Sequence, residues 1–491
     1  MTRVPSSSNI NISRYCFFVS GSSIRHTEGC TVIIISALLY HNSSYLRESL
    51  LVKNTKGSPK KEKSDTMGGM ETQLWFYVLI LVYGAFNGLS FVVDGLNLRY
   101  PRPEIPNTFE GFIDREQYHR LLSYNREKEL FQLAEGLVSF IVLLLFLLFR
   151  GPGWLDGWIT TLAVTPFWRG LLFFGVLYLF SWVLGLPFKA YFDFSIEARY
   201  GFNTKRWGTF VADELKGLLL TALFGSLVWY LFYVTFEHLG PLFPVVFGLA
   251  LWALVLLISS LYTTLIVPLF NKLSPLPEGP LTEAITDLAT KTDFPLGGIY
   301  VMNASKRSRK SNAYFSGLGR FKKIVLFDTL LEQHDTEEIL SILAHEIGHY
   351  KKGHVRRNLF FSGLSICITL TVLSLVLTSE SLSLALGATA YGVHLNLFAF
   401  FILYTPITVV ENLILLAISR RFEYEADAFA VAHTAPLWYS RALKKLFVQN
   451  LSDLYPHPWY VLFHYSHPPV LQRLAAVEKA TKSHPFEEIT T

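Results

Sequence analysis

The chain has 491 residues, of which 51% are hydrophobic, 15% aromatic and only 16% charged, and its mean hydropathy is +0.34. This composition is too apolar for a water-soluble protein of two or three domains and predicts a membrane protein. Three cysteines are too few for a disulfide framework or a thiolate metal site. The net charge of +5 comes from basic loops, so we expect no nucleic-acid partner.

Residues 1–66 differ from the rest of the chain. They are rich in Ser, Asn and Lys, and their apolar run at 31–40 is too short to cross a bilayer. We interpret them as a disordered extension or a mis-called start, with the natural chain beginning at Met67 or Met70. A basic tail at this point would oppose the membrane orientation that the later loops indicate.

Seven apolar segments follow, each near the length of about 20 residues that a transmembrane helix needs. They are 74–96, 134–149, 170–187, 218–236, 242–270, 359–378 and 395–419. The stretches 99–128, 189–216, 271–357 and 420–491 are rich in Lys and Arg, whereas 151–168, 237–241 and 379–394 carry almost none. The positive-inside rule places the basic stretches in the cytoplasm, so we expect a multi-pass protein of the lipid bilayer with its C-terminus inside.

The two large basic pieces flank the last pair of spans. In the first piece, 281–292 predicts an amphipathic helix, 298–302 and 324–327 predict short buried strands, and 336–352 predicts a helix. In the second piece, 421–432 and 439–454 predict helices. The expected fold is an all-α membrane protein with a small α+β portion. Its expected parts are 67–270 (spans one to five), 271–357 (catalytic segment), 358–419 (spans six and seven) and 420–491 (helical C-terminal segment).

The helix expected at 336–352 carries the pattern His345-Glu346-x-x-His349. Residues four apart lie on one face of a helix, so the two imidazoles can bind one Zn²⁺. Glu346 can reach a zinc-bound water as general base, as in metalloproteases with this motif. A chance pattern within a helix is the alternative.

A third ligand must come from elsewhere in the chain. His354 follows His345 by nine positions, about 180° round a continuous helix, so we expect it to point away. Glu423 and Asp427 are four apart, so Glu423 can bind zinc while Asp427 accepts the N–H of a ligand histidine. Glu425 faces away from both. A solvated charged face is the alternative for this run.

The zinc motif together with Arg420-Arg421-Phe422-Glu423-Tyr424-x-Ala426-Asp427-Ala428-Phe429-Ala430 resembles the type I CAAX prenyl endopeptidases, integral-membrane zinc proteases with seven spans. The likeness runs from about residue 74 to the C-terminus. It includes Gly185-Leu186-Pro187, Gly201-Phe202-Asn203, Ser311-Asn312-Ala313-Tyr314-Phe315, His464-Tyr465-Ser466-His467-Pro468-Pro469 and the segments 275–279, 305–308 and 324–331.

The resemblance implies seven long helices around a water-filled chamber within the membrane. One Zn²⁺, held by His345, His349 and Glu423, would close the cytoplasmic end. Glu411 falls inside the last apolar segment, where a carboxylate should face water rather than lipid. It either contacts substrate or joins helices to one another, and the sequence favours neither.

The resemblance also implies where a peptide substrate binds. Asn312 and Ala313 would lie on an edge that pairs with an extended substrate backbone. His467 would stabilise the oxyanion or orient the substrate carbonyl, with Arg473 beside it. Glu346 would take the proton of the attacking water and pass it to the leaving amine. Without the resemblance, Asn312 would more often be a turn residue and His467 a structural or surface one.

The implied substrate is a farnesylated or geranylgeranylated Cys-a-a-X protein that loses its last three residues. Two features favour instead a bacterial inner-membrane protease that acts on damaged, unprenylated membrane proteins. The segment 485–491 lacks a dilysine signal for the endoplasmic reticulum, and the link between Leu331 and the zinc helix is short. A non-proteolytic channel or translocation factor with a structural zinc is a further alternative, which Glu346 argues against. In either membrane we expect the site to face the cytoplasm.

Overall fold

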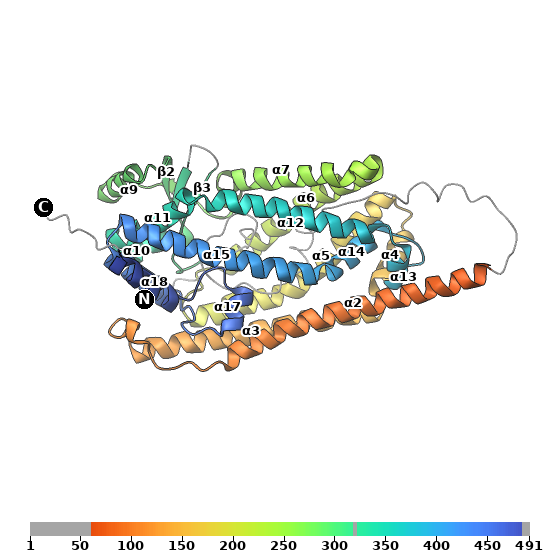
Figure 1. Cartoon of the computed structure of the whole chain (residues 1–491), viewed down its shortest axis with the longest axis horizontal. Helices are drawn as coiled ribbons and strands as arrows, with labels where there is room; N and C mark the ends of the chain where they lie inside the picture. Colours follow the sequence, from red (N-terminus) through yellow and green to blue (C-terminus); the bar gives the residue numbers. More distant parts are fainter. Residues whose placement is uncertain (1–59, 318–321, 484–491) are drawn as a thin grey trace.

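The computed structural model describes residues 60–317 and 322–483, so the predictions for 1–59 lie outside the described residues. Most of the chain is helical. The helices α2, α3, α7, α12 and α15 run along the length of the molecule, whereas β2, β3 and the shorter helices α9, α10, α11 and α18 gather at one end (Figure 1). The helices α4 and α13 lie at the opposite end.

The long helices contain the predicted spans. They are α2 (Lys60–Arg99), α3 (Arg115–Leu148), α5 (Pro166–Tyr191), α6 (Trp207–Leu239), α7 (Phe243–Leu261), α12 (His354–Leu377), α14 (Val393–Leu403) and α15 (Thr405–His433). The shorter helices are α4 (Gly151–Thr160), α8 (Val267–Phe270), α9 (Pro280–Lys291), α10 (Asp328–Gln333), α11 (Thr336–Lys351), α13 (Glu380–Ala385), α16 (Pro436–Gln449), α17 (Pro458–His464) and α18 (Val470–Ser483). Short 3₁₀ or π turns occur at η2 (Asn107–Phe109), η3 (Phe192–Glu197), η4 (Gly240–Leu242), η5 (Tyr262–Ile266) and η6 (Ala304–Lys306).

Within the described residues, 5 helical stretches are long and apolar enough to cross a membrane, or 6 if the bent pair α14 and α15 forms one span. The stretch Trp207–Phe270 holds two predicted spans, as α6 and α7 joined by η4. The predicted span 395–419 is broken at Tyr404, where the two helices meet at 49°. Pro406 follows directly and cannot continue the helical hydrogen bonding of α14.

Two boundaries differ from the prediction. The helix α2 begins at Lys60, seven residues before the expected start at Met67. The helix α15 runs unbroken from Thr405 to His433, so the boundary expected at 419/420 falls inside one helix and the separate helix at 421–432 does not exist.

A small sheet has the strand order β1-β2-β4-β3. Its strands are β1 (Leu273–Pro275), β2 (Leu296–Met302), β3 (Ala313–Ser316) and β4 (Lys322–Phe327). The parallel pair β2 and β4 corresponds to the two predicted strands, whereas β1 and β3 each add an antiparallel strand that the sequence did not predict. The strand β3 lies at the edge of the described sheet and contacts α11.

Two main hydrophobic cores hold the fold together. One joins the sheet, α9, α11 and α16, with Ile285, Leu326 and Leu343 at most 1% exposed. The other joins α5, α7 and α14, with Phe173, Phe247 and Phe400 fully buried. The protein itself covers only part of the apolar windows of the spanning helices: 6% of the window in Pro166–Glu197, 11% of that in Gly68–Arg99 and 39% of that in Trp207–Phe270 is buried. Lipid must therefore cover much of this apolar surface.

Candidate metal centre

The helix α11 is held in place at its first turn. Glu338 is fully buried there, and its carboxylate pairs with Arg441 at 2.9 Å and Lys445 at 2.8 Å, both on α16. The same carboxylate accepts the backbone N–H of Asp335 at 3.1 Å, which satisfies one of the free donors at the helix start. A buried carboxylate with two cationic partners therefore fixes α11 against α16.

A close approach of α11 and α15 brings the motif histidines to the carboxylates. A Cβ on Gly348 would lie 3.1 Å from the Cα of Ala426 and 3.2 Å from its carbonyl oxygen. Neither residue has a side chain larger than a methyl group, so the two backbones can pack directly together. His345 and His349 lie one turn apart on α11, so both side chains face Glu423 across this contact.

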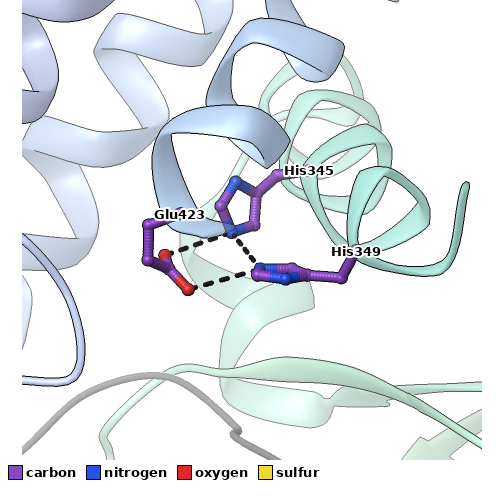
Figure 2. A group of neighbouring side chains, drawn as sticks. All are labelled: His345, His349 and Glu423. Carbon is purple, nitrogen blue, oxygen red and sulfur yellow. Dashed lines mark hydrogen bonds and ion pairs between the residues drawn. The ribbon is translucent and has the colours of Figure 1, made fainter. Parts of the chain in front are cut away.

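The three predicted ligands converge (Figure 2). His345 Nε2 lies 3.1 Å from His349 Nε2 and 3.5 Å from Glu423 Oε2, and His349 Nε2 lies 3.3 Å from Glu423 Oε1. A tetrahedral Zn²⁺ with bonds of about 2.1 Å separates its ligand atoms by about 3.4 Å. Glu423 Oε2 is buried and has no hydrogen-bond donor among the described residues, although Arg473 Nη1 lies 3.5 Å from it. These distances and the donor set fit one zinc ion.

Glu346 lies next to the three ligands on α11 and is half-buried. Burial raises the pKa of its carboxyl above the ordinary value, although the neighbouring His345 and His349 oppose the shift. Its position beside the ligands makes Glu346 the candidate for proton transfer at this site.

Asp427 supports the other nitrogen of His345, as predicted for a carboxylate one turn beyond Glu423. Its Oδ1 lies 2.9 Å from His345 Nδ1. It also accepts hydrogen bonds from Arg473, at 2.5 and 2.9 Å, and from the Tyr439 hydroxyl at 2.5 Å. Tyr439, 1% exposed, is a site residue that the sequence reasoning missed, because an aromatic residue at the start of a predicted helix is indistinguishable from ordinary core.

His467 also reaches the site, from the loop between α17 and α18. Its Nε2 lies 3.2 Å from Glu423 Oε1, and its Nδ1 lies 2.8 Å from the Ser466 hydroxyl. Burial lowers the pKa of His467 to about 4, so the ring is neutral at physiological pH. Arg473 lies nearby, and its guanidinium pairs with Asp427 at 2.5 Å and with Glu423 Oε2 at 3.5 Å.

His354 is where the sequence prediction was wrong in part. It is not one of the three converging ligands, but it does not point away: its Nδ1 lies 2.9 Å from His349 Nδ1, and its Nε2 lies 3.1 Å from Glu425 Oε2. His354 would lie about 180° round the helix from His345 only if one helix continued through both residues. Gly353 instead adopts a left-handed φ of 72°, which ends α11 and starts α12 in a new direction.

The remaining candidates, Asn312, Ala313 and Glu411, have contacts with residues other than the three ligands. Ala313 opens β3, and its backbone N–H is bonded to the side-chain oxygen of Asn312 at 2.8 Å. Glu411 lies in the apolar part of α15 and accepts hydrogen bonds from Ser365 at 3.0 Å and from Tyr404 at 3.1 Å. It therefore joins α15 to α12 and to the break between α14 and α15.

The protein has several apolar helices that are long enough to cross a membrane. Its site combines two histidines, a glutamate and a further carboxylate in the motif of metalloproteases. These features together define an integral-membrane peptidase. Comparisons with known proteins agree. Residues 96–272 match the CAAX prenyl protease N-terminal model with its five membrane helices, and residues 275–481 match peptidase family M48. The chain belongs to the CAAX prenyl protease family of M48 peptidases.

Individual relatives cover most of the chain. The CAAX prenyl protease 1 homolog of Oryza sativa is 33% identical over 84% of this chain and 97% of its own length. The CAAX prenyl protease 1 of Saccharomyces cerevisiae is 31% identical over 76% of this chain and 88% of its own. The crystal structure of S. mikatae Ste24p matches with a TM-score of 0.79 and 30% identity, covering 82% of this chain and 99% of that one.

Proposed function

We propose that this membrane peptidase is a zinc endopeptidase that cleaves near the C-terminus of prenylated Cys-a-a-X proteins. The convergence of His345, His349 and Glu423 carries the proposal for zinc, and the names of the relatives support the substrate class. When bound at this position, zinc would act as a Lewis acid: it would lower the pKa of a bound water towards 7 and polarise a carbonyl group.

In this proposal Glu346 is the general base. Its carboxylate takes the proton of the attacking water and then gives it to the leaving amine. The raised pKa of Glu346 supports both transfers, because a carboxyl that titrates closer to neutrality returns a proton more readily.

His467 is assigned to the oxyanion of the scissile carbonyl. The Ser466 hydroxyl can donate to Nδ1, which leaves the ring proton on Nε2, the nitrogen that faces Glu423. A neutral N–H donor at this place stabilises negative charge as it develops on the carbonyl oxygen. Arg473 holds Asp427, and Asp427 in turn orients His345.

The edge strand β3 is the proposed place for the substrate backbone. Ala313 lies at its start, and β3 contacts the helix that carries the zinc motif. An extended peptide can add to such an edge as a further strand. A substrate carbonyl would replace the Asn312 side chain as acceptor for the Ala313 N–H.

We further propose that seven spans enclose a hollow and that the site faces the cytoplasm. Counting α6 and α7 separately and the bent pair α14 and α15 as one gives seven. The low burial of the spanning windows suits helices that surround a space rather than pack together. The basic loops give the orientation. The relatives above come from rice and yeast, which favours the endoplasmic reticulum over a bacterial inner membrane.

The test uses the purified full chain in detergent and two matched peptides, one with a farnesylated Cys-a-a-X end and one unprenylated, each with and without a zinc chelator. We expect cleavage of the prenylated peptide, abolished by the chelator and restored by added zinc. Equal cleavage of both peptides would indicate quality control of unprenylated proteins instead. No cleavage of either peptide by zinc-loaded protein would favour the channel or translocation function.

A further inference from the structure

The second motif histidine has a polar neighbour at each ring nitrogen. His349 Nε2 faces Glu423 at 3.3 Å, on the side of the proposed zinc. His349 Nδ1 faces His354 Nδ1 at 2.9 Å, on the opposite side. His354 Nε2 lies 3.1 Å from Glu425 Oε2. These contacts form a chain that leads from the proposed metal position to a carboxylate outside it.

A zinc ion bound to His349 would determine which nitrogen atoms of His349 and His354 carry a proton. A histidine that binds zinc through Nε2 must carry its proton on Nδ1. The Nδ1–H of His349 can donate to His354 only if His354 Nδ1 is unprotonated, which places the His354 proton on Nε2. The carboxylate of Glu425 then accepts that proton's hydrogen bond. Every donor meets an acceptor with both rings neutral.

We infer that His354 and Glu425 are positioning residues that hold the zinc ligand His349 in its binding orientation. The inference rests on the proposed zinc site. His354 is 2% exposed and stacks on Phe422 with 4.1 Å between ring centroids and 6° between planes, so its ring cannot turn freely. Arg357 pairs with Glu425 at 3.2 Å and holds the carboxylate. Support of this kind orients a metal ligand and raises its basicity.

The two zinc histidines are therefore supported in different ways. His345 meets a carboxylate directly, since Asp427 lies 2.9 Å from its Nδ1. His349 meets a carboxylate through a second imidazole. Because His354 is the first residue of α12, this second support ties the metal site to a membrane-spanning helix as well as to α15.

The test measures zinc affinity rather than turnover. His354→Phe keeps the ring stacked on Phe422 but removes both nitrogens, and His354→Asn restores an acceptor near the position of Nδ1. We expect the zinc dissociation constant of the full chain in detergent, from chelator competition, to rise about 10- to 100-fold in His354→Phe and less in His354→Asn. Glu425→Ala should also weaken zinc binding, whereas Glu478→Ala, which removes an exposed ion pair on α18, should not.

Each outcome decides a different point. If the wild-type chain binds no zinc, the proposed metal centre is wrong. If the wild-type chain binds zinc and His354→Phe binds it equally tightly, only this inference is overturned. A lower thermal midpoint of the zinc-free His354→Phe chain with an unchanged dissociation constant would assign His354 a purely structural role. If His354→Phe does not fold, unchanged zinc binding by Glu425→Ala overturns the inference.

Discussion

Glu346 lies beside the three proposed zinc ligands without being one of them, so a substitution there tests the proposed proton transfer separately from metal binding. We predict that Glu346→Gln retains zinc and fold but loses turnover by several orders of magnitude, since glutamine cannot accept the proton of the attacking water. Metal analysis and peptide cleavage on the same preparation measure both properties. A metal-replete variant with normal cleavage would remove Glu346 from the mechanism.

His334, between α10 and α11, makes stability depend on pH. It is 6% exposed, neither ring nitrogen has a hydrogen-bond partner among the described residues, and burial lowers its pKa to about 4. Its charged neighbours Glu338 and Lys445 shift the pKa in opposite directions. The unfolded chain, with an ordinary pKa near 6.5, takes up the proton first as pH falls.

We therefore predict that acidification from pH 6.5 to 4 lowers the stability of the wild-type chain more than that of His334→Leu, by on the order of 2 kcal/mol. Above pH 7 the stability difference between the two chains should no longer change with pH. Thermal unfolding of both chains in detergent across this range measures it. Parallel pH profiles would show that the buried ring does not contribute.

Residues of the site could be predicted where a local spacing carries the chemistry. His345, His349, Glu423 and Asp427 are each one helical turn from a partner, and the structure places all of them together. The contacts of His354 could not be predicted from a straight helix, because the positive φ of Gly353 turns the chain just before it.

At the scale of elements, the site depends on how closely α11 and α15 approach. Gly348 permits that approach. We predict that Gly348→Ala moves the helices apart by a few tenths of an ångström and weakens zinc binding, because its methyl group would meet the backbone of Ala426, which cannot turn aside. Gly217→Ala, where a Cβ meets nothing within 4 Å, is the matched control and should leave zinc binding unchanged. Equal zinc affinity in both variants would show that the approach is not limiting.

Apolar elements were easier to predict from the sequence than short or bent ones. The seven predicted spans all lie in helices because hydropathy is a local property of about 20 residues. The strand β3, four residues long, has no alternating pattern of its own and forms only because β4 offers a partner. The bend at Tyr404 is explained by the nearby Pro406, whereas hydropathy carries no signal that α15 continues beyond its apolar segment.

Across the whole protein, a buried ion pair joins α3 and η3 to the segment that precedes β3. Lys310, which precedes β3, donates to Glu197 of η3 at 2.9 Å and to the hydroxyl of Tyr124 of α3 at 3.0 Å. The Glu197 side chain is 2% exposed. A buried carboxylate that loses its cation is strongly destabilising.

We predict that Lys310→Met lowers the stability of the full chain by about 3 kcal/mol, because Glu197 would remain buried without its cation. Thermal unfolding in detergent measures the change. Lys291→Met breaks an exposed pair with Asp287 on α9 and should leave the midpoint close to that of the wild-type chain. Equal midpoints for the two variants would contradict a structural role for the buried pair.

The continuity of α15 has a consequence for where a lipid-anchored substrate is cut. Glu411, in the apolar part of the helix, and Glu423, at the proposed metal, are joined by unbroken helix and lie about 18 Å apart along its axis. The proposed metal position therefore stays at a fixed distance along α15 from the apolar part of the helix. Under the proposed function, this fixed length of α15 would set the distance between the prenyl group in the membrane and the bond that is cut.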